Sequence, residues 1–124
     1  MRVPYRALAA VAAMAVLVGP SSTSIQGQAP AAPILLVVNS AGPNPFGGYL
    51  AEILRAEGIT AFDSVELSTL TAGTLGAHRL AILAETPLTA GQASMFDAYV
   101  TSGGRLVAMR PDAQLATTLG IAPV

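Results

Sequence analysis

The side chains best suited to chemistry in this 124-residue sequence follow its apolar runs. In an open parallel sheet, ligand sites form beyond the carboxyl ends of the strands, so polar residues that follow predicted strands are candidates for a site. Seven residues meet this condition: Asn39, Ser40, Asn44, Glu85, Thr86, Arg110 and Asp112. The alternative interpretation is that they are ordinary loop residues that cap helices and bond to backbone groups.

Two of these residues are carboxylates, which could serve as acid and base in a hydrolase. Glu85 and Asp112 follow different apolar runs and would meet at one edge of the sheet. Arg110 belongs to the same predicted edge, so an ion pair between Arg110 and one of the two acids is the simpler expectation.

Other kinds of site are excluded by residue type. The sequence has no Cys and a single His, His78, so it lacks a thiol nucleophile and the ligands of a zinc site. His78 precedes the apolar run at residues 80–84, which places it at the amino edge of the sheet, and we expect it to be an exposed loop residue. The segment NSAGPNPFGG at residues 39–48 has neither G-x-G-x-x-G nor a P-loop Lys. We therefore expect no metal and no cofactor.

Four segments are predicted to be the strands that position the candidate residues. They lie at residues 34–38, 59–67, 80–84 and 106–109. The runs at 34–38 and 80–84 are continuous rather than alternating, which is typical of strands buried on both faces of a parallel sheet. Helical patterns separate the strands, and right-handed crossovers then give a doubly wound α/β fold with strand order 2-1-3-4.

The first helix is predicted to begin near Pro45 and to end at Gly58, which can adopt the left-handed conformation that terminates helices. Four apolar residues share one face at helical spacing. They are Phe46, Leu50, Ile53 and Leu54. A further single helical turn is expected within residues 69–76.

The next helix is predicted from a capping box, because Thr89 and Gln92 have the T-x-x-Q spacing. Its buried stripe is expected to comprise Ala93, Phe96 and Val100, and Gly103-Gly104 ends it. After the last strand, Asp112 is expected to cap a short helix whose Leu115 and Leu119 face inward.

Residues 1–29 have the pattern of a secretory signal peptide. Arg2 and Arg6 supply a positive start, residues 7–19 are apolar, and small residues precede a cleavage site after Ala29. The apolar run is shorter than the roughly 20 residues that a spanning helix needs. We expect a secreted or extracytoplasmic protein with a linker at residues 30–33 and a domain at residues 34–124; the alternative is an uncleaved amino-terminal anchor.

The charge balance bears on partners. Without residues 1–29, four Arg and seven acidic residues remain, a net charge of −3, and there is no Lys. Nucleic-acid binding needs clustered Lys and Arg, and binding to an anionic membrane needs a basic patch. We therefore expect no nucleic-acid partner and no membrane association after signal cleavage.

The segment RLVAMRPDAQLATTLG at residues 105–120 resembles the nucleophile-elbow region of class I glutamine amidotransferase-like domains, which have a flavodoxin-like α/β fold. In that family a strand runs into G-x-C-x-G-H-Q and a helix that ends in Leu-Gly. Residues 106–109 match the strand, Gln114 and Leu115 match the Gln-Leu after the elbow, and Leu119 and Gly120 match the helix end. The resemblance covers residues 34–124 and includes domains of exported bacterial proteins.

The sequence departs from the family pattern at its catalytic position. Arg110 stands where the family has its nucleophilic Cys, and Pro111 and Asp112 replace the small residues of the elbow. The family's His and Glu partners would lie beyond Val124. A guanidinium is always charged and cannot act as a nucleophile, so the resemblance implies the fold without the family's activity.

Two functional hypotheses follow from these observations. The first is an exported, non-catalytic α/β binding or structural module of a larger extracellular protein. The second is a hydrolase that acts on a carbohydrate or an amide through strand-end carboxylates. We also expect the domain to be incomplete at its carboxyl end, because the strand at residues 106–109 is apolar on both faces yet outermost. The expected consequence is self-association, or contact with further domains, through this strand.

Overall fold

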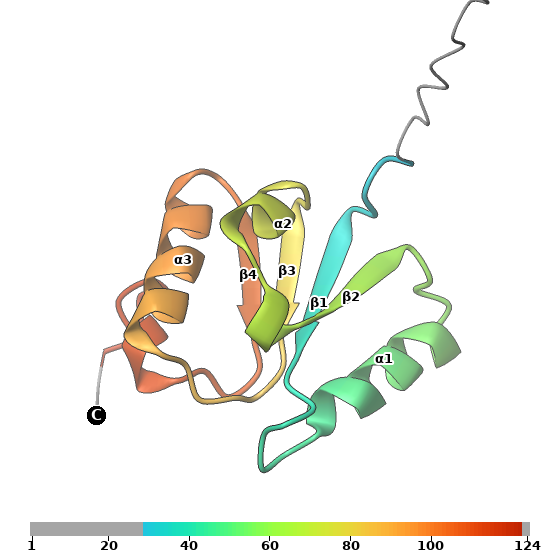
Figure 1. Ribbon diagram of the computed structural model, residues 1–124, viewed down its shortest axis with the longest axis horizontal. Helices are drawn as coiled ribbons and strands as arrows, with labels where there is room; N and C mark the ends of the chain where they lie inside the picture. The colour runs from blue at the N-terminus through green and yellow to red at the C-terminus, as the bar shows by residue number, and fades with distance from the viewer. Residues whose placement is uncertain (1–28, 123–124) are drawn as a thin grey trace, which may run out of the picture.

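The computed structural model describes residues 29–122, which build a four-stranded, all-parallel sheet with helices on both faces (Figure 1). The predicted signal segment lies outside the described residues except for Ala29, as do residues 123 and 124 of the predicted domain. In chain order the elements are β1 (Ile34–Val38), α1 (Phe46–Ala56), β2 (Phe62–Glu66), η1 (Leu67–Thr69), α2 (Ala72–Gly76), β3 (Leu80–Leu83), α3 (Ala90–Thr101), β4 (Arg105–Ala108) and η2 (Ala113–Leu115).

The strand order is β2-β1-β3-β4, which confirms the predicted α/β class and topology. Ile34 of β1 pairs with Phe62 of β2 on one side and with Leu80 of β3 on the other. One bound differs clearly from the prediction, because β2 begins at Phe62 and not at residue 59. The reason is local: the Ile59 N–H donates to the Leu54 carbonyl and belongs to the end of α1.

One face of the sheet carries the main core. Leu35, Val37, Ala81 and Leu83 alternate onto this face, where they pack against α2, α3 and η2. The residues of α3 that enter this core are Ala93, Phe96 and Tyr99. The predicted stripe named Val100 as its third member, but Val100 is only partly buried and Tyr99 is the fully packed residue. A Cβ on Gly104 would lie 2.4 Å from the Tyr99 ring, so the close packing of this ring requires glycine there.

Helix α1 lies on the opposite face of the sheet, where it packs on β1 (Figure 1). Gly47 lies directly against Val38 of β1, where a Cβ would approach within 2.7 Å, and Ala51 is buried one turn later. This close approach turns Ile53 away from the sheet, and its side chain is 48% exposed. The prediction that Ile53 belongs to the buried face of the helix was therefore wrong.

The predicted helix signals are confirmed at the helix ends. Thr89 and Gln92 form both hydrogen bonds of a capping box at the start of α3. At the end of α1, Gly58 has φ +83°. Its N–H donates to the Arg55 carbonyl and the Ile59 N–H donates to the Leu54 carbonyl, which are the two hydrogen bonds of a Schellman motif. Asp112 caps the last short helix as predicted, although that helix is the single 3-10 turn η2.

Candidate functional site

The loops after β1, β3 and β4 meet at the carboxyl edge of the sheet, and Glu85 lies at the centre of their contacts. Its carboxylate accepts a hydrogen bond of 3.0 Å from the Asn44 side-chain amide. The Arg110 guanidinium lies 3.3 Å from the same carboxylate, which confirms the predicted ion pair. Because the Arg110 side chain is 82% exposed, this pair is an exposed one.

Arg110, whose side chain pairs with Glu85, also has an unusual backbone conformation. Its φ is +44°, and among the described residues it alone is a non-glycine residue with positive φ. Bulky side chains rarely adopt this region, which costs of order 1–3 kcal/mol. The turn between β4 and the 3-10 turn η2 therefore contains a strained residue with a guanidinium side chain.

Asn39 and Thr86 form a second link between the loops after β1 and β3. The Asn39 side-chain amide donates to the Thr86 hydroxyl over 2.8 Å, and Thr86 is buried. The Thr86 hydroxyl also lies 3.4 Å from the Pro87 carbonyl. A hydroxyl with both its donor and acceptor roles engaged and no base beside it is not set up for nucleophilic attack.

Ser40 turns away from the cluster around Glu85 and binds Glu66 at the end of β2. Both the hydroxyl and the backbone N–H of Ser40 donate to the Glu66 carboxylate. These two bonds, the hydroxyl bond foremost, hold the pKa of Glu66 below its ordinary value. Sequence reasoning missed Glu66, although its place as the last residue of β2 puts it beside the loop after β1.

Asp112 holds two loops together with its two oxygens. One accepts the Gln114 N–H over 2.9 Å and the other accepts the Leu88 N–H over 3.0 Å. These two backbone bonds keep the pKa of Asp112 below its ordinary value. The Gln114 side-chain amide adds a bond of 2.6 Å to the Leu88 carbonyl. A carboxylate so stabilised in its ionised form is poorly suited to act as a general acid.

The strand-end residues surround a small open cavity of about 190 Å³. Its polar lining comes from Asn44, Glu85, Thr86, Arg110 and Asp112, with Pro43 and Pro87 completing it. Five of the predicted site residues, counting Thr86, therefore share one cavity, while Asn39 lies behind Thr86 and Ser40 faces β2.

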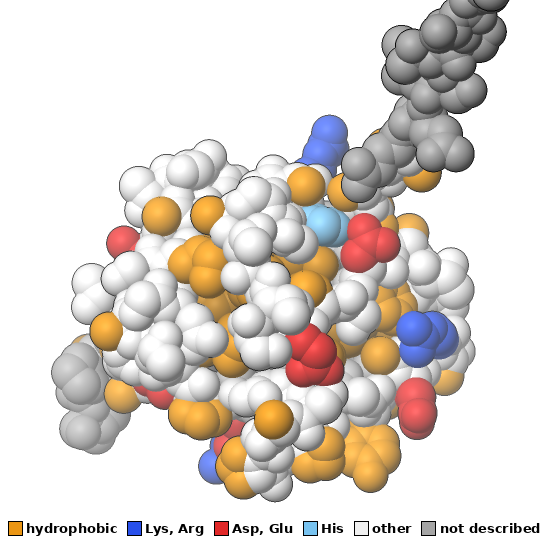
Figure 2. All heavy atoms as spheres, viewed as in Figure 1, with side chains coloured by type: hydrophobic (Ala, Val, Ile, Leu, Met, Phe, Trp, Pro, Cys, Tyr) orange, Lys and Arg blue, Asp and Glu red, His pale blue; other side chains and the backbone are white. Residues whose placement is uncertain are grey.

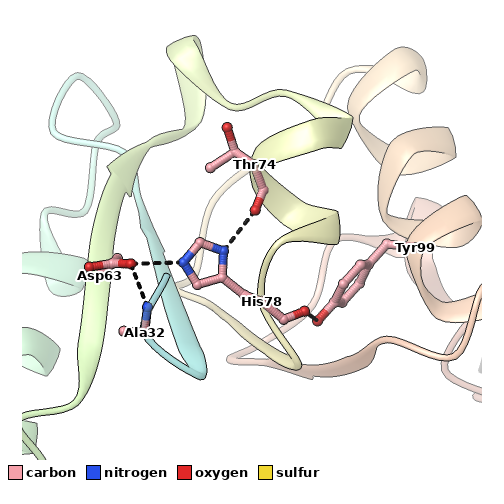
Figure 3. Close-up of polar contacts among 5 residues, drawn as sticks. All are labelled: Ala32, Asp63, Thr74, His78 and Tyr99. Atoms are coloured by element: carbon pink, nitrogen blue, oxygen red, sulfur yellow. Dashed lines mark hydrogen bonds and ion pairs between the residues drawn. The ribbon is translucent and has the colours of Figure 1, made fainter. Parts of the chain in front are cut away.

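His78 corrects the sequence analysis, because it is buried and not an exposed loop residue (Figure 3). Its ring lies between α2 and β2, where Nδ1 is 2.7 Å from the Thr74 carbonyl and Nε2 is 3.0 Å from the Asp63 carboxylate. The prediction failed because it placed His78 only relative to β3, whereas α2 and β2 together cover the residue. The acidic residue within β2 was the signal that could have pointed to a partner.

The two contacts of His78 make it a structural tether. One ring nitrogen faces a backbone carbonyl of α2 and the other faces a carboxylate of β2, so the imidazole joins these two elements. Asp63 also accepts the Ala32 N–H over 3.0 Å, and the bonds from His78 and Ala32 lower the pKa of Asp63. The Tyr99 hydroxyl donates to the His78 carbonyl over 3.1 Å, which adds a link to α3.

Structural contacts therefore engage Glu85 and Asp112 at the carboxyl edge and Asp63 beside His78. A hollow of about 350 Å³ at the amino edge is larger than the strand-end cavity, but its only imidazole, His78, is held by Thr74 and Asp63. Within residues 29–122, no group of three His, Asp or Glu side chains could hold a metal ion. On the face shown in Figure 2, the arginine and acidic side chains are dispersed and form no large patch.

Among the helices of the described residues, none is long and apolar enough to cross a membrane. Protein-family models, curated proteins and solved structures provide no match to this chain.

Proposed function

We propose that this chain is an exported, non-catalytic α/β domain that serves as a binding or structural module of a larger extracellular protein. The observation that carries the proposal is Arg110, which occupies the tip of the turn after β4 and pairs with Glu85. In the amidotransferase-like domains that the sequence resembles, this position belongs to the catalytic nucleophile.

The backbone of Arg110 supports the comparison with those domains. A nucleophile elbow is a sharp, strained turn between a strand and a helix, and Arg110, which follows β4 and Met109, has φ +44°. In this chain the corresponding turn carries a side chain that cannot attack a carbonyl, which supports the non-catalytic proposal. A domain that keeps this turn without a nucleophile is suited to holding loops or a ligand, not to turnover.

The alternative of a hydrolase using strand-end carboxylates is less well supported. Glu85 binds Asn44 and Arg110, and both oxygens of Asp112 accept backbone N–H groups. An acid catalyst needs a pKa near the working pH, whereas the bonds to Asp112 lower its pKa.

Hydrolysis assays separate the two functions. The purified chain is expected to release no product above a blank from glutamine, simple anilides or nitrophenyl glycosides. The matched variant is Glu85→Gln, which removes the strand-end carboxylate but keeps a side chain able to bond Asn44. Turnover by the native chain that is lost in Glu85→Gln would mean that the site is catalytic and the proposal is wrong.

Export is the other half of the proposal and is tested separately. The chain is expected in the extracytoplasmic fraction with a mature amino terminus at Pro30, because the small residues before the site suit cleavage after Ala29. The intact mass of the secreted product measures this terminus. A product that retains Met1 would contradict cleavage.

A further inference from the structure

The α1 side of the sheet is only half covered. Alternation places Leu80 and Ile82 of β3, together with Val107 of β4, on the same face as α1. Met109 continues the alternation and bonds to β3 through its N–H. Val107 is 46% exposed and Met109 is also exposed, whereas Leu80 and Ile82 are half-buried, so the cover of this half is incomplete and is thinnest over β4.

The orientation of α1 places further apolar groups beside this bare half. Gly47 faces the sheet, and the Arg55 guanidinium lies 5.1 Å from the ring centre of Phe62 on β2, so the Arg55 flank faces β2. Successive residues of a helix are rotated by about 100°, so Ile53 lies on the flank opposite Arg55 and Tyr49 lies on the side of α1 that faces away from the sheet. That flank faces β3 and β4, and both residues are exposed.

On this side of the molecule the surface is raised where α1 packs on the sheet and lower beside the helix, over β4. A helix of about 10 Å diameter packs on β1, and β3 and β4, spaced about 4.8 Å apart, lie beside it with Val107 of β4 exposed. The bare half has the width of one helix. A two-fold axis parallel to the strands, at the level of the helices, would place the outer side of each α1 on the bare half of the other copy.

The charges fit the same arrangement. Arg105 lies at the amino end of β4, and the alternation puts its side chain on the bare face. Glu52 lies on the outer side of α1, which runs toward the amino edge of the sheet, and Glu57 follows at its end. Neither Arg105 nor Glu52 forms an ion pair with another described residue. A second copy would bring Glu52 toward the partner's arginine.

We propose that two copies of this chain form a symmetric dimer in which α1 of each copy lies on the bare β3–β4 face of the other. Tyr49 and Ile53 then pack on Val107 and Met109 of the partner, and Glu52 meets Arg105. The inference stands on residues outside the strand-end site, so it goes beyond the proposed function.

Sedimentation analysis of the secreted chain tests the dimer. The native chain is expected to dimerise, and Ile53→Asp or Val107→Asp is expected to weaken the dimer about 30-fold or more, as at a buried interface anchor. Ile121→Asp is the matched control, because Ile121 is 50% exposed and lies beyond η2. A native chain that stays monomeric, or a dimer equally weakened by Ile121→Asp, overturns the proposal.

Charge reversal tests the arrangement within the dimer. Arg105→Glu and Glu52→Arg are each expected to weaken association a few-fold, and the double variant is expected to restore it. The Ala108 N–H points away from β3, so Ala108→Pro would disrupt a dimer formed by edge pairing of β4. The face-to-face arrangement is overturned if Ala108→Pro abolishes the dimer while Ile53→Asp and the charge reversals leave it unaffected. Hydrolysis activity in a stable dimer would instead refute only the proposed function.

Discussion

The two faces of the sheet are built from the same strands but have different degrees of cover. The α2–α3 face is closed by Phe96, Tyr99 and Leu115, all buried. The α1 face is closed where α1 packs on β1, but its cover thins toward β4, where Val107 is 46% exposed. Apolar alternation on both faces of a strand therefore does not mean that both faces are buried within one chain. One face is a core, and the other is surface available to a partner.

The largest contrast in stability is expected between Phe96 and Val107. Phe96→Ala should lower the free energy of unfolding by about 3–5 kcal/mol, because it leaves a cavity in the closed face. Val107→Ala should change it by less than about 0.5 kcal/mol when measured at a chain concentration too low for association. Urea unfolding measures both. Equal losses would mean that the bare face is part of the folded core.

Removal of His78 is expected to have the next largest effect. His78→Ala leaves the Thr74 carbonyl without its side-chain donor and unlinks Asp63 from α2, at a cost of about 1–3 kcal/mol. Thermal unfolding compared with Arg79→Ala, at the exposed neighbouring position, measures the loss. If the two variants have the same stability, the tether has no energetic role.

Acid should weaken the carboxyl edge through Asp112. A pKa lowered by folding contributes stability above the ordinary value of 3.8, and this contribution is lost as the pH falls through the folded pKa. Asp112→Asn should therefore be less stable than the native chain at neutral pH, and this difference in the free energy of unfolding should shrink as the pH falls to about 2. Unfolding curves at several pH values check this. A stability difference that does not change with pH would contradict the lowered pKa of Asp112. The pKa values of Asp63 and Glu66 are also lowered, but both residues are present in both proteins, so their contribution cancels in the difference.

The smallest effect is expected at the exposed ion pair between Arg110 and Glu85. Arg110→Ala and Glu85→Ala should each change stability by about 0–1 kcal/mol, since an exposed ion pair is screened by solvent. Arg110→Gly should be more stable than Arg110→Ala, because glycine adopts φ +44° without strain. The reverse order in urea unfolding would mean that the backbone at Arg110 is not strained.

The sequence was sufficient for the elements and their order. Continuous apolar runs identified β1 and β3, and the Thr89–Gln92 spacing fixed the start of α3. It could not predict that Gly47 would bring α1 so close to Val38 that Ile53 turns outward, because periodicity gives a face but not its exact direction.

The candidate site was only partly predictable. The loops after β3 and β4 brought Glu85, Arg110 and Asp112 to one cavity, as parallel strands require. The contacts of Ser40 with Glu66 and of His78 with Asp63 both depend on β2, whose register is set by tertiary pairing. No local pattern in the sequence encodes that register.

The most direct test of the central claim, that the bare face is an interface between copies, is site-directed cross-linking. The chain has no Cys, so thiols can be introduced without background. Ile53→Cys mixed with Val107→Cys and treated with a short bis-maleimide is expected to give a cross-linked dimer that contains one of each variant. Ile121→Cys mixed with Val107→Cys is the matched control. Efficient cross-linking in the first mixture alone supports the account, and equal or absent cross-linking in the two mixtures contradicts it.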